Sequence, residues 1–191
     1  MGVVDKDNLI DGKNIVEGDI LIGLPSAKKI LISRVLDKSG LSLTDQFPGN
    51  DCKTSTVGEI LMTPTAIYVK QVLEIIRKGG VKSLAHTTGG GFTDNTSRVF
   101  PTRLGAKIFI GSWEVPLVFK WLQQVGEIED AEMTRTFNMG VRMVLVVSEE
   151  AIDRIIKESS RAYRIGEVSS VQVFRPVNFH SFNQLDSYRI L

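Results

Sequence analysis

The sequence is poor in the residues that build covalent and metal cross-links. Its 191 residues contain one cysteine, Cys52, and two histidines, His86 and His180. A single cysteine excludes an internal disulfide, and so few cysteines and histidines do not make the ligand cluster of a protein-built zinc site. We therefore expect a fold held together by its apolar core, with no metal centre built from these side chains.

Long apolar stretches and an excess of one charge are missing as well. No apolar run approaches the roughly 20 residues that a membrane span needs. Lys and Arg number 23 against 22 Asp and Glu, so the formal net charge is +1 and creates no general attraction for nucleic acid or anionic lipid. No nucleophile elbow or Ser-His-Asp order argues for a hydrolase. We expect neither a nucleic-acid nor a membrane partner, and any phosphate must be recognised locally.

Short apolar runs alternate with amphipathic stretches along most of the chain. Strands are predicted at 19–24, 81–86, 106–110 and 141–147, and helices at about 28–38, 65–78, 94–100, 115–125 and 149–158. Residues 42–57 are polar and predict an exposed loop. The alternation indicates an α/β fold forming one domain over residues 1–168, followed by a divergent tail over 169–191. On the helix that begins near Thr65, the residues predicted to face the core are Ile67, Val72, Ile75 and Ile76.

The sharpest turn expected in the chain follows the strand at 81–86. Gly89, Gly90 and Gly91 let the backbone approach a bound group and direct N–H donors at it, and the next helix adds a partial positive charge. This is the chemistry of a phosphate cradle. A tight turn with nothing bound is the alternative, because neither the dinucleotide fingerprint nor the P-loop spacing is satisfied. His86 stands just before the turn and can donate to a phosphate or move a proton, unless it is a satisfied core histidine.

Four polar residues near the turn or before the last predicted strand are further candidates. Asp94 and Asn95 follow the glycines closely and can contact a ligand, although the role of helix N-cap is favoured for Asp94. Arg135 and Asn138 precede the strand at 141–147, where a guanidinium and an amide can face a cleft. A surface arginine and a turn asparagine are the alternative. We take Asn95, Arg135 and Asn138 as candidate binding residues.

Five blocks of sequence, taken in order and spacing, resemble aminoimidazole ribonucleotide synthetase, the phosphoribosylformylglycinamidine cyclo-ligase. These blocks are Gly18–Ser26, Pro64–Lys70, Ala85–Phe92, Trp121–Gln123 and Arg135–Gly140. The resemblance covers about residues 2–168, corresponds to the C-terminal half of that family, and is most similar to its plant members. It implies an α/β fold in which a mixed sheet is packed with helices.

The resemblance also implies a reaction and its participants. In the family, ATP with Mg²⁺ activates the amide oxygen of formylglycinamidine ribonucleotide as a phosphorylated imidate, and an internal nitrogen closes the imidazole ring with loss of phosphate. The resemblance further implies a homodimer, a phosphorylated ribonucleotide substrate and a role in purine biosynthesis. Most of the nucleotide and metal machinery is expected in an N-terminal half that this chain lacks. With no targeting signal visible, the compartment is expected to be plastid or cytoplasm.

The resemblance implies that the glycine turn and its histidine line the substrate and phosphate cleft, and the residue patterns above add the remaining candidates. We predict His86 as the catalytic residue, and the predicted substrate or phosphate contacts are Gly89, Gly90, Gly91, Asn95, Arg135 and Asn138. No residue is predicted to bind a metal.

The chain departs from the family pattern at three places. After Ser26 a histidine-containing turn is missing, Thr96-Ser97 stands where Ile-Pro is usual, and Val141-Arg142 replaces a glycine-rich step. These changes leave open an alternative in which the chain is a non-catalytic domain that binds a phosphorylated ligand or dimerises with a full-length partner. Selenophosphate synthetase and the hydrogenase maturation factor that dehydrates a carbamoyl group are further alternatives, against which the block Arg135–Gly140 argues.

Overall fold

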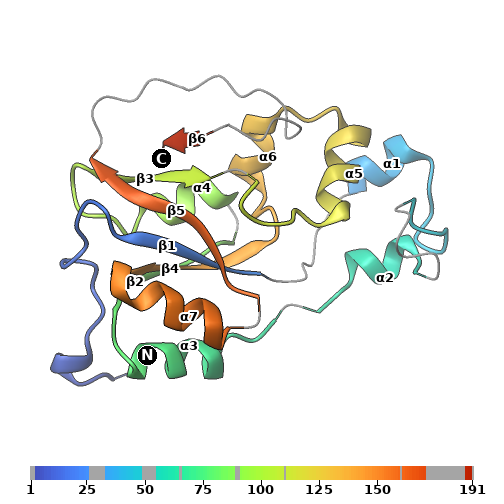
Figure 1. Ribbon diagram of the computed structural model, residues 1–191. Coiled ribbons are helices and arrows are strands. Elements are labelled where there is room, and N and C mark those ends of the chain that lie inside the picture. Colours follow the sequence, from blue (N-terminus) through green and yellow to red (C-terminus); the bar gives the residue numbers. More distant parts are fainter. Residues whose placement is uncertain are drawn as a thin grey trace.

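A single β-sheet organises the chain. The computed structural model describes residues 3–25, 33–48, 55–64, 66–88, 91–109, 111–159, 161–170 and 188–190. Its strands are β1 (Ile20–Pro25), β2 (Val81–His86), β3 (Leu104–Phe109), β4 (Val141–Val147), β5 (Tyr163–Ser170) and β6 (Tyr188–Ile190). They lie in the order β2-β4-β1-β5-β3-β6 (Figure 1). Strands that are neighbours in the sheet are therefore mostly distant in the sequence.

All the strand pairs in the described part are antiparallel, where a mixed sheet was expected. β4 pairs with both β1 and β2, and β5 pairs with both β1 and β3. The three strands that helices connect, β1, β2 and β3, consequently run in one direction, as an alternating strand-helix pattern predicts. They do not touch one another because β4 and β5 insert between them. The α/β class itself, with helices packed on a sheet, is confirmed.

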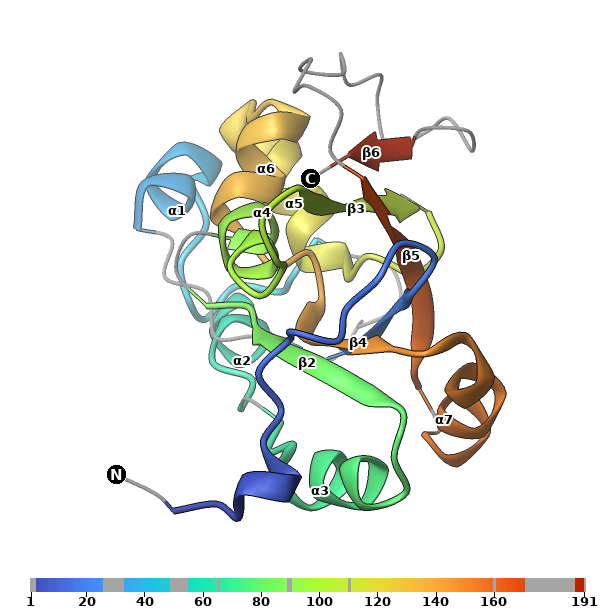
Figure 2. The ribbon, with the colours of Figure 1, turned by 90° about the vertical axis from the view of Figure 1, so that its left-hand side faces the viewer.

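Helices cover both faces of this sheet. They are α1 (Ser33–Ser39), α2 (Val57–Leu61), α3 (Val69–Arg77), α4 (Gly91–Ser97), α5 (Leu117–Gly126), α6 (Asp130–Thr136) and α7 (Ile152–Glu158), with short 3-10 turns at Lys6–Asn8 and Glu149–Ala151. Figures 1 and 2 both show α3 and α7 on one side of the sheet and α4 and α6 on the other. α4 packs against α6, and α1 against α5. No described helix has the length and apolar content to cross a membrane.

The core is divided into two layers because successive side chains of a strand point to opposite faces. In β1, Ile20, Ile22 and Leu24 pack towards α3 and α7, whereas Leu21 faces the layer under α5 and α6. β4 behaves in the same way, with Leu145 on one side and its neighbours on the other. Each such side chain contributes about 1.5–3 kcal/mol when fully buried, so β1 and β4 anchor both layers.

The predicted strands 81–86 and 141–147 are confirmed to the residue, but other elements were missed or misplaced. The expected loop at 42–57 ends in α2, and neither α6 nor β5 was foreseen. Ile67 was predicted to face the core and is 88% exposed. α3 begins only at Val69, so helical periodicity does not apply to Ile67, and Tyr68 takes the buried place instead. The Tyr68 hydroxyl donates to the Pro25 carbonyl at 3.0 Å.

β5 (Tyr163–Ser170) runs across the boundary between residues 168 and 169, where the sequence predicted that the domain ends and the tail begins. Its last residue, Ser170, pairs with Leu104 of β3. Cys52, His180 and the shortened connection after Ser26 lie outside the described residues.

Candidate functional site

The candidate site is built where β2 and β4 end side by side. His86 is the last residue of β2 and pairs with Met143 of β4. The next residue, Thr87, donates its backbone N–H to the Arg142 carbonyl at 2.7 Å. The chain is therefore held against β4 up to the start of the glycine turn. Gly89 and Gly90 lie outside the described residues, and their predicted role in phosphate binding stays a prediction.

Gly91, the first residue of α4, has a packing role of its own. Its φ of +65° is a conformation that favours glycine. A Cβ atom there would lie 2.1 Å from the Arg135 carbonyl oxygen and 2.6 Å from that of Thr134. The backbone of α4 thus touches the last turn of α6 directly. Absence of a side chain at Gly91 is required for this contact, whatever the turn binds.

His86 is exposed and has one described side-chain partner. The Arg142 Nε–H donates to His86 Nε2 at 3.1 Å. Partial burial and, second, the positive charge of Arg142 lower the pKa of His86 from its ordinary value. A lowered pKa favours the neutral imidazole at neutral pH. His86 is therefore not a satisfied core histidine, and it stands at the turn as a neutral ring.

The other predicted binding residues differ in where they point. Arg135 is exposed on α6 and forms an ion pair with Glu132, with 2.7 Å between Nη2 and Oε2. Asn95 is buried in α4, and its amide donates to the Gly91 carbonyl at 2.7 Å, which stabilises the first turn of that helix. Asp94 lies within the first turn of α4, not at the N-cap that was favoured for it, because the helix begins earlier than predicted.

Asn138 retains a buried donor that nothing in the described part satisfies. It is 1% exposed, and its Oδ1 accepts from the Gly140 N–H at 3.3 Å. Its Nδ2 has no hydrogen-bond partner among the described residues. Because an unsatisfied buried polar group costs about 1–3 kcal/mol, such a group is a candidate for contact with a ligand. The sequence had identified Asn138, but only its packing reveals the free amide.

Two threonines around the turn share this property and were missed from the sequence. The hydroxyls of Thr87, at the end of β2, and Thr96, in α4, are buried and lack a partner within the described residues. Thr87 belongs to the glycine-rich block that drew attention to His86, but a threonine at a strand end gives no signal by itself. The unsatisfied hydroxyls appear only once the chain is folded.

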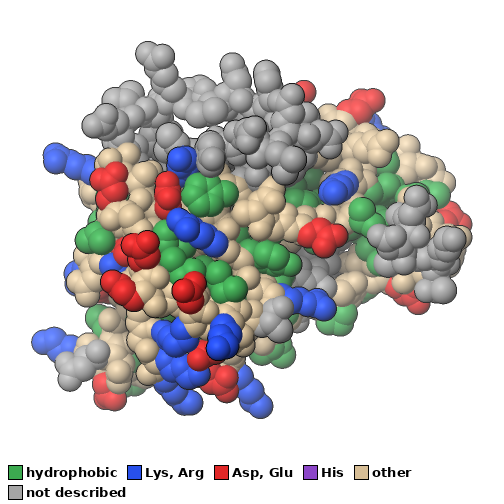
Figure 3. Space-filling model, in the orientation of Figure 1, with side chains coloured by type: hydrophobic (Ala, Val, Ile, Leu, Met, Phe, Trp, Pro, Cys, Tyr) green, Lys and Arg blue, Asp and Glu red, His purple; other side chains and the backbone are tan. Residues whose placement is uncertain are grey.

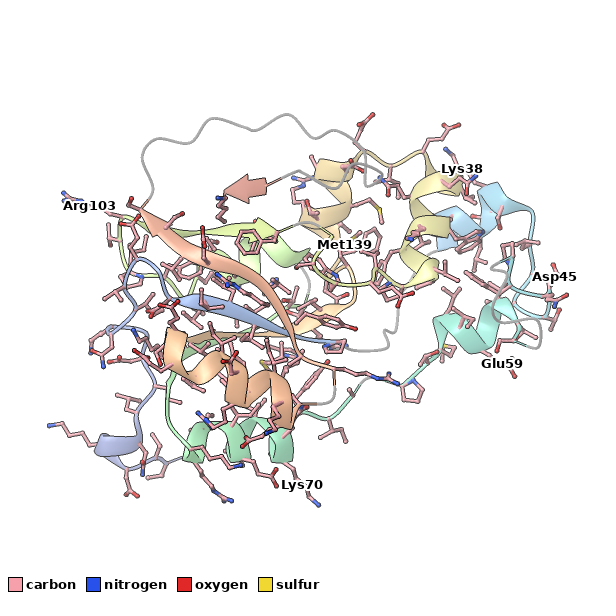
Figure 4. All side chains as sticks on the ribbon, in the orientation of Figure 1. Lys38, Asp45, Glu59, Lys70, Arg103 and Met139 are labelled. Carbon is pink, nitrogen blue, oxygen red and sulfur yellow. The ribbon has the colours of Figure 1, made fainter. Side chains whose placement is uncertain are left out.

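The backbone after Asn138 is fixed by an unusual turn. Met139 and Gly140 both have positive φ, +47° and +91°. The Trp113 indole N–H donates to the Met139 carbonyl at 2.9 Å, and a Cβ at Gly140 would lie 2.5 Å from Pro116 Cδ. Figure 4 shows Met139 in the interior of the molecule. These contacts position Asn138 directly before β4.

Replacing Thr87 by valine is expected to stabilise the protein by about 0.5–1 kcal/mol, because it removes a buried hydroxyl that has no partner while keeping the shape. Urea unfolding of the free protein measures the change. Thr134→Val is the matched control, since the Thr134 hydroxyl donates to the Ala131 carbonyl at 3.0 Å and its loss should destabilise. A destabilised Thr87→Val variant would show that the hydroxyl is bonded in solution.

The surface over α3 and α7 carries charges of both signs (Figure 3) and gives no candidate for a binding site. Basic and acidic side chains lie next to one another over α3 and α7 (Figure 3), where Lys78 pairs with Glu158 at 2.8 Å. Within the described residues, no group of three or more His, Cys, Asp or Glu could hold a metal ion. The candidate groups described at this site are neutral hydrogen-bonding side chains together with the arginines Arg135 and Arg142.

Comparison with known proteins gives a family match and close relatives. The family described as AIR synthase related protein, C-terminal domain, matches residues 16–177. The chain is 60% identical over 178 residues to phosphoribosylformylglycinamidine cyclo-ligase, chloroplastic/mitochondrial, of Vigna unguiculata, a match that covers 89% of this chain and 45% of the relative. It is 58% identical over 177 residues to the chloroplastic enzyme of the same name from Arabidopsis thaliana, covering 88% and 45%. The chain thus spans about half the length of these curated relatives.

A solved structure shows the same fold at low sequence identity. The hydrogenase maturation protein HypE in complex with ATP superposes with a TM-score of 0.56 at 17% identity, covering 88% of this chain and 47% of that one.

Proposed function

Because the chain belongs to the family of AIR synthase related proteins, as their C-terminal domain, we propose that it is the C-terminal half of a phosphoribosylformylglycinamidine cyclo-ligase. The observation that carries this proposal is the 60% identity with the Vigna unguiculata enzyme across 89% of the chain. The reaction would be the ATP-dependent ring closure of formylglycinamidine ribonucleotide to aminoimidazole ribonucleotide in purine biosynthesis. HypE shares only the fold, at 17% identity.

In this proposal the described residues bind and orient the substrate. His86, the hydroxyl of Thr87 and the free amide of Asn138 are neutral hydrogen-bond donors, which suit a phosphate or amide oxygen better than a magnesium ion. ATP with Mg²⁺ supplies the phosphoryl group that activates the amide oxygen. Most of the nucleotide and metal site is assigned to the half of the relatives that this chain does not match. Gly89, Gly90 and Arg135 stay candidates for contacts with the substrate.

The compartment and assembly belong to the same proposal. The Arabidopsis thaliana relative is named as chloroplastic and the Vigna unguiculata relative as chloroplastic/mitochondrial, which supports a plastid location for this chain. We also propose that the protein forms a homodimer, the assembly that the resemblance to the family implies. A non-catalytic domain that binds the phosphorylated ligand or dimerises with a full-length partner is the competing function.

An assay of ring closure separates the two functions. We would measure ATP-dependent formation of aminoimidazole ribonucleotide by the chain alone and by the chain mixed with the N-terminal half of the Vigna unguiculata enzyme. We expect turnover only in the mixture. Binding of formylglycinamidine ribonucleotide without turnover in the mixture would support the non-catalytic domain. The absence of both binding and turnover would overturn the proposed function.

Within that mixture, His86→Ala is expected to lower kcat/KM about 10- to 100-fold, the effect of losing one hydrogen bond to a charged group. Arg164→Ala is the matched control, because Arg164 lies on β5, exposed and paired with Glu167 at 3.7 Å. Equal activity of His86→Ala and the control would remove His86 from the site.

A further inference from the structure

The contact between Arg142 and His86 determines which ring nitrogen can carry a proton. A guanidinium only donates hydrogen bonds and stays charged at all accessible pH values. The imidazole nitrogen that receives the Arg142 Nε–H, Nε2, must therefore present a lone pair. In a neutral imidazole the single proton then resides on Nδ1.

Position and strand register make this contact specific. His86 pairs with Met143 across the β2–β4 ladder, and the Arg142 carbonyl accepts from the Thr87 N–H at 2.7 Å. The backbones of both partners are therefore fixed on adjacent strands, one residue out of register. Arg142 is half-buried, whereas His86 is exposed. His86 thus keeps exposed surface that a ligand can contact.

We propose that Arg142 is a positioning residue that holds His86 in the neutral tautomer with its proton on Nδ1. His86 then meets its ligand as a hydrogen-bond donor to an anionic or carbonyl oxygen, and not as a proton acceptor at Nε2. The identity of that ligand rests on the proposed function, whereas the tautomer does not. The lowered pKa of His86 agrees with a ring kept neutral beside a cation.

The other charged side chains near β2 do not hold the His86 ring in the way that Arg142 does. Lys82 lies at the opposite end of β2 and is bonded to Asp19 at 2.6 Å. Asp94, on the helix α4 that packs against β2, and Arg98, which directly follows that helix, are exposed. Arg142 is the charged side chain with a described hydrogen bond to the His86 ring.

Nitrogen-15 NMR of the ligand-free chain tests the tautomer directly. Long-range proton–nitrogen correlations distinguish a protonated from an unprotonated ring nitrogen, and His180→Gln assigns the signals because the chain has only two histidines. Above the titration range of histidine, we expect wild-type His86 with Nδ1 protonated and Nε2 unprotonated. In Arg142→Met the proton should shift mainly to Nε2, and the pKa of His86 should rise. Arg164→Met, the control for loss of a positive charge, should change neither.

Wild-type His86 with its proton on Nε2 would overturn the proposal without any variant, as would an unchanged tautomer in a folded Arg142→Met. These spectra contain no substrate. Failure of the ring-closure assay would therefore leave the tautomer result standing, and an Nε2–H tautomer would leave the proposed function standing.

Discussion

Gly91→Ala is expected to lower the free energy of unfolding by about 3–4 kcal/mol, because two separate costs add. The left-handed backbone conformation, with φ of +65°, penalises any Cβ. The new methyl group would also lie 2.1 Å from the Arg135 carbonyl oxygen, where the neighbour is backbone and cannot rotate away. α4 and α6 would have to separate. Urea unfolding followed by circular dichroism measures the loss.

Alanine variants at two other glycines measure the two contributions to the free energy of unfolding separately. Gly40 has nearly the same φ, +67°, and no atom within 4 Å of a Cβ, so Gly40→Ala should cost about 1 kcal/mol from the backbone alone. Gly166 lies outside the positive-φ region, but a Cβ would meet the Lys107 carbonyl at 2.3 Å, so Gly166→Ala reports the contact alone, about 1–3 kcal/mol. If Gly91→Ala costs no more than Gly40→Ala, the close approach of α4 to α6 is absent in solution.

The role of Gly91 shows what the sequence could and could not predict about the site. A glycine run after a strand indicated a turn that admits close approach, and Gly91, the one glycine of the run that the structure describes, is approached closely by another group. The approaching group at Gly91 is helix α6, which was not foreseen because Asp130–Thr136 has a weak apolar pattern. A sequence pattern shows that space is needed, but it does not show whether a ligand or another part of the chain fills that space.

Asn138 and Thr87 illustrate the same limit for polar groups. Asn138 was a candidate from its place between a helix and a strand, and the structure adds the buried amide without a partner. Thr87 could not be identified, because its hydroxyl differs from that of any other strand-end threonine only in its surroundings. Unsatisfied hydrogen-bonding groups depend on packing between distant segments, which local periodicity does not encode.

The order of the strands in the sheet could not be predicted from the sequence, for a related reason. The patterns of β2 and β4 predicted their boundaries, since both are short apolar strands between clear turn signals. Nothing local places β4 between β1 and β2, because antiparallel neighbours here are joined through long connections. The consequence is an ion pair that no motif would suggest: Lys82 of β2 reaches past β4 to Asp19, which precedes β1.

Lys82→Met is expected to destabilise the protein by about 3 kcal/mol, because it leaves a buried carboxylate without its cation. The Asp19 side chain is 5% exposed and that of Lys82 21%, and Nζ contacts both carboxylate oxygens at 2.6 and 2.8 Å. Asp19 also accepts from the Val16 N–H at 2.7 Å, and this bond offsets only part of the loss. Urea unfolding at neutral pH measures the effect.

The reason for the loss can be tested with two further variants. Lys78→Met removes a lysine from an exposed pair with Glu158 and should cost about 0–1 kcal/mol. Adding Asp19→Asn to Lys82→Met removes the unpaired negative charge and should recover most of the stability. The amide oxygen of the new side chain can still accept the hydrogen bond from the Val16 N–H. If Lys82→Met costs no more than Lys78→Met, solvent reaches Asp19 freely. In that case the pair does not hold the segment before β1 against the far edge of the sheet.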